Sequence, residues 1–338
     1  MLYCGIDLGK KSSRFCVVDD NRKVQEQGWV KMRDDSLVER FGQMAPMKIV
    51  VEASSRTFWV GDLLEEMGHD VFVVDPGRTK AIGASRIKHD KLDARVLAEL
   101  CQAGLLATVD RPSKAERLQR VSITARDVLV RARTKLINAA KSMLENEGYQ
   151  VASTSSDRTV RALDEALEKA PEELANSVSL LVEEIEHMSE AIGVCDEGLK
   201  QMSQENKTMK MLQTLDGVGP LTAAVYVLVI RNPERFSSGR QVGAYLGLVP
   251  SLYSSGQTHV LGRITRRGNS QLRFLLTMAA GSLLRSRRDS PLKRWALELA
   301  ERVGRKKARV ALARKIANVM WSMWKHERPF ELRWAETH

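Results

Sequence analysis

The order of short apolar segments in the first 75 residues constrains the fold of this chain more than any other feature. Three strand-like segments come first, at residues 2–9, 13–18 and 23–30, with Asp19-Asp20-Asn21 as turn residues between the last two. Segments with helical and strand-like periodicity then alternate, at residues 36–43, 47–52, 58–67 and 70–75. The chain therefore begins with an α/β domain in which a meander precedes strands joined by helices.

Acidic residues end two of these strands, and this order of elements is that of an RNase H-like domain. Asp7 ends the first strand segment and Glu52 ends the fourth. Neighbouring strands lie about 4.8 Å apart, so both acids are expected to project toward one spot. A helix predicted over residues 91–105 has Asp90 and Asp93 three positions apart, on one side of its first turn. The prediction is a cluster of four carboxylates.

Four close carboxylates repel one another unless a cation neutralises them, and oxygen-only ligands suit Mg²⁺ or Mn²⁺. Two such ions stabilise the attacking and leaving oxygens of a phosphoryl transfer. Each acid alone also has a simpler interpretation: Asp7 as a strand-end cap, Glu52 as a surface residue, and Asp90 with Asp93 as solvated acids at a helix N-terminus. The four together favour a catalytic metal site.

The first strand and its turn permit a second interpretation. Residues 5–13, Gly-Ile-Asp-Leu-Gly-Lys-Lys-Ser-Ser, also resemble the first phosphate loop of the actin and sugar-kinase fold, which shares the β-meander. Those kinases need a duplicated second domain with another phosphate loop and a glycine-rich adenosine site. The downstream sequence contains neither, which disfavours a kinase.

Charge and cysteine usage narrow the class of protein. A formal net charge of +11 favours a polyanionic partner, either nucleic acid or an acidic membrane. Binding of clustered Lys and Arg to phosphates is favourable because it releases the counterions condensed on them. The four cysteines have no CxxC or Cys/His spacing, which argues against structural zinc and a disulfide framework and predicts buried thiols. With neither a signal peptide nor a membrane span in evidence, we expect a cytoplasmic protein with no membrane partner.

The middle of the chain is helical. Residues 113–147 have apolar residues at helical spacing interleaved with basic ones, and a second long helix is predicted over residues 176–202, which is acidic. They are expected to form an antiparallel helical hairpin, or coiled-coil arms that pair between subunits. The basic helix could lie along a nucleic-acid backbone or simply expose a solvated face. The polar connection over residues 153–175 is predicted to be flexible.

The last third contains a glycine turn and an arginine-rich loop. Leu215-Asp216-Gly217-Val218-Gly219 between apolar segments predicts a helix-hairpin-helix, in which glycines let backbone N–H groups approach a phosphate; a tight helix connection is the alternative. Ser255 lies in a polar loop, where a serine before glycine is also a common turn. Beyond it, five residues are candidates for nucleic-acid binding: Arg263, Arg266, Arg267, Asn269 and Arg273. A loop serine beside such arginines is suited to attack a phosphodiester.

Seven motifs together resemble one family over essentially the whole chain. They are Gly5-Ile6-Asp7, Val51-Glu52-Ala53, Asp90-Lys91-Leu92-Asp93-Ala94-Arg95, Leu215-Asp216-Gly217-Val218-Gly219, Tyr245-Leu246-Gly247-Leu248-Val249-Pro250, Ser255-Gly256 and Arg267-Gly268-Asn269. In this order they resemble the DEDD transposases of insertion sequences. That class includes the Piv/MooV DNA invertases and the bridge-RNA-guided recombinases of the insertion-sequence family numbered one-ten, with its eleven-eleven subgroup. One departure is Ser54-Ser55 after the glutamate, where the family often has glycine; this predicts a looser turn.

The resemblance implies a RuvC-like DEDD catalytic domain over residues 1–110, a coiled-coil helical region over 111–206, and a mainly helical C-terminal transposase domain over 207–338. It implies that Asp7, Glu52, Asp90 and Asp93 bind Mg²⁺ and that Ser255 attacks the scissile phosphate to form a phosphoserine link. It further implies a site completed between protomers of a dimer or tetramer. Target and donor DNA, and a structured non-coding guide RNA, are the implied partners.

Two other functions remain open at this stage. A RuvC-type junction nuclease would keep the metal site without the serine and would release free DNA ends. A non-catalytic nucleic-acid-binding protein would bind DNA or RNA without metal-dependent chemistry.

Overall fold

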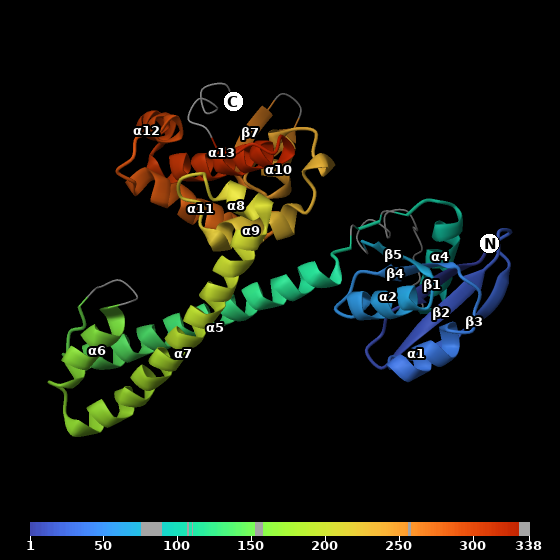
Figure 1. The fold of residues 1–338 in the computed structure, drawn as a ribbon, viewed down its shortest axis with the longest axis horizontal. Coiled ribbons are helices and arrows are strands. Elements are labelled where there is room, and N and C mark those ends of the chain that lie inside the picture. The colour runs from blue at the N-terminus through green and yellow to red at the C-terminus, as the bar shows by residue number, and fades with distance from the viewer. Residues whose placement is uncertain (76–89, 107, 110, 153–157, 256–257, 331–338) are drawn as a thin grey trace. The chain divides into compact units, whose positions relative to one another are not determined.

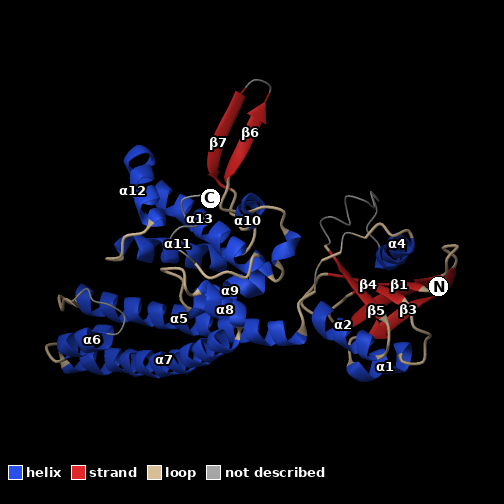
Figure 2. Ribbon diagram, turned by 45° about the horizontal axis from the view of Figure 1, so that its top comes forward, coloured by secondary structure: helices blue, strands red, loops and turns tan. Residues whose placement is uncertain are grey.

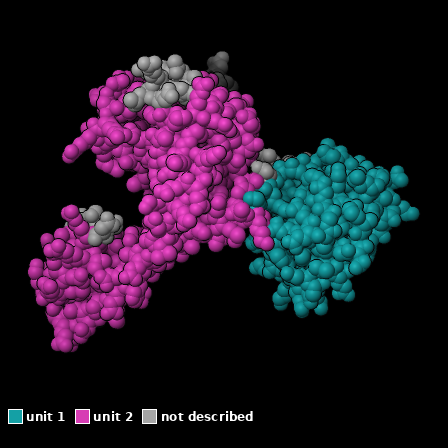
Figure 3. Space-filling view, in the orientation of Figure 1, with its two compact units in different colours: residues 1–113 teal, residues 114–338 magenta. Residues whose placement is uncertain are grey.

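A computed structural model describes residues 1–75, 90–106, 108–109, 111–152, 158–255 and 258–330. Of residues 90–93 and 253–261 it describes the backbone. The chain divides into two compact units, Met1–Ser113 and Lys114–His338, which Figure 3 distinguishes by colour. Each unit has a hydrophobic core of its own.

The first unit is built on a five-stranded mixed sheet in the order β3-β2-β1-β4-β5 (Figure 1). The strands are β1 (Tyr3–Asp7), β2 (Ser12–Val18), β3 (Val24–Lys31), β4 (Lys48–Glu52) and β5 (Asp70–Val74). The first three pair antiparallel, whereas β4 is parallel to both β1 and β5. Each predicted strand of residues 1–75 is present, with bounds that move by at most two residues.

Helices cover both faces of this sheet. On one face, α1 (Asp34–Phe41) and α2 (Thr57–Glu66) pack over a core that includes Phe15, Phe41 and Ile49. On the other face lies α4 (Asp90–Gln102), whose small residues Ala94 and Ala98 are fully buried. The central strands are therefore apolar on both sides, which explains the continuous apolar run Ile49-Val50-Val51.

The second unit begins with two long helices, α5 (Lys114–Asn146) and α7 (Glu172–Glu205). They pack side by side and antiparallel: Arg126 forms an ion pair with Asp196, and the Arg133 guanidinium donates to Ser189 Oγ at 3.1 Å. Moving forward along α5 thus moves backward along α7. The predicted antiparallel helical hairpin is present within the chain (Figure 1).

The connection between these helices corrects the sequence prediction. Residues 158–175 are largely helical: α6 (Thr159–Leu167) forms there, and α7 begins four residues earlier than predicted. Residues 153–157 lie outside the described part. The reason is an apolar stripe at helical spacing, Ala162, Leu163 and Ala166, which is buried in one cluster with residues of α5 and α7. The polar residues around it obscured that spacing.

A helical body follows, with the apolar helix α9 at its centre. Tyr226 of α9 is completely buried, and its hydroxyl donates to the carbonyl oxygen of Ala317 at 2.7 Å. The helices are α8 (Lys207–Leu212), α9 (Pro220–Ile230), the short 3-10 helix η2 (Pro233–Arg235), α10 (Gly239–Tyr245), α11 (Ser270–Arg285), α12 (Pro291–Val303) and α13 (Arg305–Lys325). This unit is mainly helical, as predicted.

One β-hairpin interrupts the helical body. It consists of β6 (Pro250–Ser255) and β7 (Thr258–Ile264), and Figure 2 shows it projecting from the helices of its unit. Apart from this hairpin, the sheet of the first unit is the only one among the described residues.

Two further predictions concern composition. The four cysteines all lie in the described part and form no disulfide; Cys4, Cys16 and Cys101 are buried, and Cys195 is partly exposed. Across the ranges that the structure describes, no helix has both the length and the apolar character to cross a membrane.

Candidate active site

Asp7 and Glu52 end two neighbouring parallel strands in matching register. The last recorded partners of β1 and β4 are Ile6 and Val51, and the two acids are the next residues on their strands. Side chains alternate between the faces of a sheet, so Asp7 shares a face with Gly5 and Glu52 shares one with Val50. Both of those residues lie under α4. The two acids therefore lie on the face of the sheet that α4 covers.

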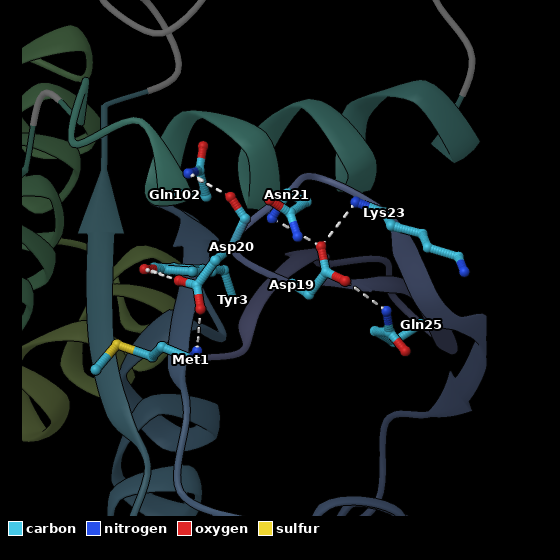
Figure 4. Close-up of polar contacts among 8 residues, drawn as sticks. All are labelled: Met1, Tyr3, Asp19, Asp20, Asn21, Lys23, Gln25 and Gln102. Atoms are coloured by element: carbon cyan, nitrogen blue, oxygen red, sulfur yellow. Dashed lines mark hydrogen bonds and ion pairs between the residues drawn. The ribbon is translucent and has the colours of Figure 1, made fainter.

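The direction of α4 brings its first turn toward the same strand ends. At the opposite end of the helix, Gln102 donates to the backbone carbonyl of Asp20 at 3.0 Å (Figure 4). The Asp20 carboxylate in turn accepts from the Tyr3 hydroxyl at 3.1 Å, at the start of β1. The hydrogen bond from the chain's amino group, followed by the one from Tyr3, lowers the pKa of Asp20. Because the C-terminus of α4 lies over the start of β1, its N-terminus points toward the end where Asp7 lies.

Gly5 makes this close crossing possible. A Cβ atom at Gly5 would collide with the Ala94 carbonyl oxygen and come within 2.7 Å of both the Ala98 nitrogen and the Leu97 Cβ. Only a residue without a side chain fits there. The helix thus lies directly on the strand, two residues from Asp7.

Asp90 and Asp93 lie in the first turn of α4, and Asp93 directly precedes Ala94. Their side chains fall outside the described part, so the four-carboxylate cluster stays a prediction. Among the side chains that are described, no group of three or more His, Cys, Asp and Glu residues is arranged to hold a metal ion.

The turn after Glu52 is held by a threonine instead of a glycine. The Thr57 hydroxyl donates to the Glu52 carbonyl oxygen at 2.7 Å and accepts from the Ser54 backbone N–H at 2.7 Å. Thr57 is buried, so neither bond competes with water. The looser turn expected from Ser54-Ser55 is therefore not observed.

Two residues beside Asp7 were missed by the sequence analysis. Arg14 is the β2 partner of Asp7, and Trp29 is the β3 partner of Arg14. The Arg14 guanidinium carbon lies 5.3 Å from the Trp29 ring centroid, a cation–π distance, and Trp29 is 55% exposed. The signal was available: an aromatic and a basic residue at outward positions of two adjacent strands.

Ser255 ends β6 at the tip of the hairpin in the second unit, where its backbone partner is Thr258. Its side chain and residues 256–257 fall outside the described part. The acids and Ser255 thus belong to different compact units of the chain.

The base of this hairpin is clamped by two glycines from the family motifs. A Cβ atom at Gly247 would collide with the Arg267 carbonyl oxygen, and one at Gly268 with that of Tyr245; both glycines have positive φ, at 68° and 85°. The Thr265 N–H also donates to the Val249 carbonyl at 2.9 Å. The Tyr245–Pro250 and Arg267–Asn269 motifs are therefore two halves of one backbone clasp.

The five predicted nucleic-acid-binding residues have different structural roles. Arg263, Arg266 and Arg267 are exposed, and Arg266 adopts a left-handed φ of 54°. Arg273 Nη1 donates to three backbone carbonyls, those of Leu246, Arg267 and Gly268, at 2.9–3.2 Å. The Asn269 side-chain oxygen caps α11 by accepting from the Leu272 N–H at 2.8 Å. Arg273 and Asn269 thus hold the loop that displays the other three.

The glycine turn of residues 215–219 connects α8 to α9. Gly217 has a φ of 87°, and a Cβ atom there would come within 2.6 Å of the Ala279 carbonyl oxygen on α11, so this glycine serves packing. Gly219 caps α9 and faces open space. That this turn forms a helix-hairpin-helix whose backbone N–H groups contact a phosphate stays a prediction.

Comparison with known proteins matches both units. A DEDD transposase family model covers residues 4–149, and a model described as the transposase IS116/IS110/IS902 family covers residues 209–296. The chain is 30% identical over 329 residues to the transposase for insertion sequence element IS1111A of Coxiella burnetii, covering 94% of this chain and 88% of that protein. It is 27% identical to a probable family 20 transposase of Pseudomonas aeruginosa, with 96% of each covered. A pilin gene-inverting protein of Moraxella lacunata is 27% identical over 44% of this chain and 48% of its own length. The chain therefore belongs to the IS116/IS110/IS902 family of transposases, enzymes that cleave and recombine DNA.

Proposed function

We propose that this transposase recombines DNA through a covalent phosphoserine intermediate, with Ser255 as nucleophile and Asp7, Glu52, Asp90 and Asp93 as metal ligands. The observation that carries the proposal is the register of β1 and β4. Because of it, these neighbouring strands end side by side at Asp7 and Glu52, on the side toward which the N-terminus of α4 points. The first unit would be a RuvC-like domain, α5 and α7 the coiled-coil region, and the rest the transposase domain.

The donor set fits a hard divalent ion. DEDD transposases typically use divalent metal ions, and the four acids would supply only carboxylate oxygens, which Mg²⁺ prefers, with Mn²⁺ as an alternative. When bound, the metal would offset the negative charge that develops on the scissile phosphate. The protein contributes the spacing of the ligands, set by strand register and by the Gly5 crossing.

Ser255 would perform the covalent step. Its oxygen attacks the phosphorus atom, one P–O bond of the DNA backbone breaks, the departing strand oxygen gains a proton, and the serine proton passes to solvent. The number of phosphoester bonds is unchanged, so a second strand's hydroxyl can reverse the step and complete an exchange. The projecting hairpin and its clasp hold Ser255 away from the helical body of its own unit.

The exposed arginines beside the hairpin, Arg263, Arg266 and Arg267, would contact the DNA backbone. Arginine forks bind phosphate oxygens bidentately and carry no sequence information themselves. We therefore propose that sequence is read by base pairing to a non-coding guide RNA, which leaves shape and backbone recognition to the basic protein.

An apolar stripe on α5 supports a homo-oligomer. Leu118, Val121 and Val128 are 59–64% exposed and recur at heptad-like spacing, although α5 already packs against α7. A second copy of the chain would cover this stripe. A dimer or tetramer would let the acids of one protomer work with the Ser255 of another.

The test is capture of the adduct. The full-length protein is incubated in Mg²⁺ with DNA spanning the element's ends, and protein-linked DNA is detected after denaturation. Ser255→Ala should abolish the adduct, whereas Ser251→Ala, on the same strand with its hydroxyl bonded to the Arg263 carbonyl at 3.0 Å, should retain it. Asp7→Asn should suppress both cleavage and adduct.

Other outcomes select the alternatives. Cleavage to free ends with no adduct would favour the junction nuclease, and binding without any Mg²⁺-dependent chemistry would favour a non-catalytic protein. Sequencing the nucleic acid that co-purifies tests the guide: a discrete structured RNA from a flank of the element supports it, and random fragments alone count against it.

A further inference from the structure

The helical body of the second unit contains a pocket that the proposed chemistry does not use. Its volume is about 760 Å³, and it is formed by the start of α10 and the residue before it, by α12 and by α13. Sites that take small organic molecules measure roughly 300–1,000 Å³, so one nucleotide fits easily. Val249 also lines it, and the next residue, Pro250, begins the hairpin strand β6.

Apart from the neutral residues Ser238, Asn318 and Ser322, the polar lining of the pocket is basic. Arg240, Arg314, Lys315 and His326 line it, and no carboxylate is among its lining residues in the described part of the chain. The Arg314 stem is anchored, because a Cβ atom at Gly243 would come within 3.1 Å of its Cγ. Three positively charged side chains, Arg240, Arg314 and Lys315, with no carboxylate in the described lining favour a bound anion.

The apolar lining of the pocket includes two tryptophans. Trp295 from α12 has the Lys315 ammonium 4.9 Å from its ring centroid, and Trp321 from α13 is fixed by donating its indole N–H to the Pro233 carbonyl at 2.9 Å. Both side chains are half-buried. Aromatic rings beside cations are the combination that binds single-stranded nucleic acids, through base stacking and phosphate contacts.

We infer that this pocket binds one unpaired nucleotide of a single-stranded DNA or RNA segment. The base packs against Trp295 or Trp321, and Arg240, Arg314 and Lys315 hold its phosphates. Duplex nucleic acid is disfavoured, because extruding a stacked and paired base costs free energy that an unpaired base does not have to offset. The site is separate from the acids and from Ser255, and its occupancy can be measured as binding, independently of strand exchange.

The pocket lies near the root of the hairpin that ends at Ser255, so a nucleotide bound there would be close to the proposed nucleophile. Val249 lies at the root of the hairpin and Ser255 ends β6 six residues later; a strand rises about 3.3 Å per residue, so the two lie roughly 20 Å apart along it. A single strand anchored in the pocket would be held within a few nucleotides of the hairpin tip.

The experiment uses the full-length protein and fluorescent oligothymidylate, oligouridylate and a mixed-sequence duplex, each about 12 residues long. Anisotropy titrations compare wild type with Trp295→Leu/Arg314→Gln. The matched control is Arg294→Gln, an exposed neighbour on α12 that is paired with Asp289 at 2.6 Å. The double variant should bind single strands on the order of tenfold more weakly, as expected for one stacked base, with duplex affinity unchanged. The control should match wild type.

Photo-crosslinking gives a second readout that does not depend on a variant's folding. Wild-type protein is crosslinked to 5-iodouracil-substituted DNA and RNA oligonucleotides, and the attachment sites are found by mass spectrometry. Adducts at Trp295 or Trp321 support the inference, and a crosslink with one nucleic acid alone identifies the source of the nucleotide. Unchanged single-strand affinity in the double variant, an equal loss for duplex, or crosslinks confined to other surfaces would overturn it.

Discussion

Gly5 on β1 packs directly against the backbone of Ala94 on α4, so closely that no side chain fits between them. This contact joins the strand that carries Asp7 to the helix that carries Asp90 and Asp93. The geometry of the candidate site therefore depends on Gly5, a residue outside the site, and a substitution at Gly5 tests this dependence.

Gly5→Ala should destabilise the protein by about 1–3 kcal/mol, the typical cost of overpacking, and should strongly reduce Mg²⁺-dependent DNA cleavage. The added methyl group would push α4, and with it two of the acids, off the sheet. Urea denaturation and a cleavage assay measure both effects. The control is Gly193→Ala on α7, where a Cβ meets nothing within 4 Å and helix propensity predicts slight stabilisation. Equal stability of the two variants would contradict the proposed role of the crossing.

Thr57→Val should lower activity by displacing Glu52 and should cost about 1–3 kcal/mol of stability. The substitution keeps the shape of a buried side chain but leaves the Ser54 N–H and the Glu52 carbonyl without their partner. Thr134→Val is the comparison, because that exposed hydroxyl bonds a carbonyl of its own helix at 2.8 Å. If both variants keep full cleavage activity, the turn does not position the acid.

Arg273→Gln should destabilise the hairpin clasp and reduce adduct formation. Burial, followed by the charge of Arg266, lowers the pKa of Arg273, but a guanidinium remains protonated at any working pH. Removing the Arg273 guanidinium leaves three backbone carbonyls without their donor, which should lower the free energy of unfolding by about 1–3 kcal/mol. Arg263→Gln, at an exposed position, should instead weaken DNA binding and leave the melting temperature unchanged. If Arg263→Gln lowered the melting temperature and Arg273→Gln weakened only DNA binding, the structural role would belong to Arg263 and the DNA contact to Arg273.

Val121→Glu with Val128→Glu should reduce the mass of the assembly measured by light scattering, because charges on the α5 stripe oppose apolar pairing. Helicity should be retained, since both side chains are exposed. Val194→Glu on α7, at a position 76% exposed and outside the stripe, should keep the wild-type mass. A wild-type mass for the double variant would rule out this stripe as the contact between copies.

Stability should fall as the pH rises above about 8.5, where thiols ionise in the unfolded chain. Burial raises the pKa of Cys101 to about 11 and that of Cys4 well above its ordinary range. The folded state therefore keeps protons that the unfolded state releases, so each thiol subtracts at most about 1.4 kcal/mol per pH unit over this window. Urea titrations at pH 8 and 10 measure the loss. Cys101→Val should reduce this loss of stability.

Much of the secondary structure of the first unit, and the long helices of the second, could be predicted from local patterns. Strand and helix periodicities are properties of consecutive residues, so the five strands, α4 and the long helices were located within a few residues. The same patterns failed at α6, because Ala162, Leu163 and Ala166 form an apolar face too short to stand out until α5 and α7 are present to bury it.

The sequence by itself determined the order of elements in the first unit and the acids at two strand ends, because both depend on short-range spacing and residue type. It placed Ser255 in a polar loop, whereas the structure makes Ser255 the last residue of strand β6. Only the tertiary structure decided that Gly5 serves the approach of α4, that Thr57 replaces a glycine, and that Arg273 supports a loop while its neighbours stay exposed. It also placed Trp295 and Arg314 around one pocket. The physical reason is that these roles depend on atoms distant in the chain, and close packing settles which side chains fit where such segments meet.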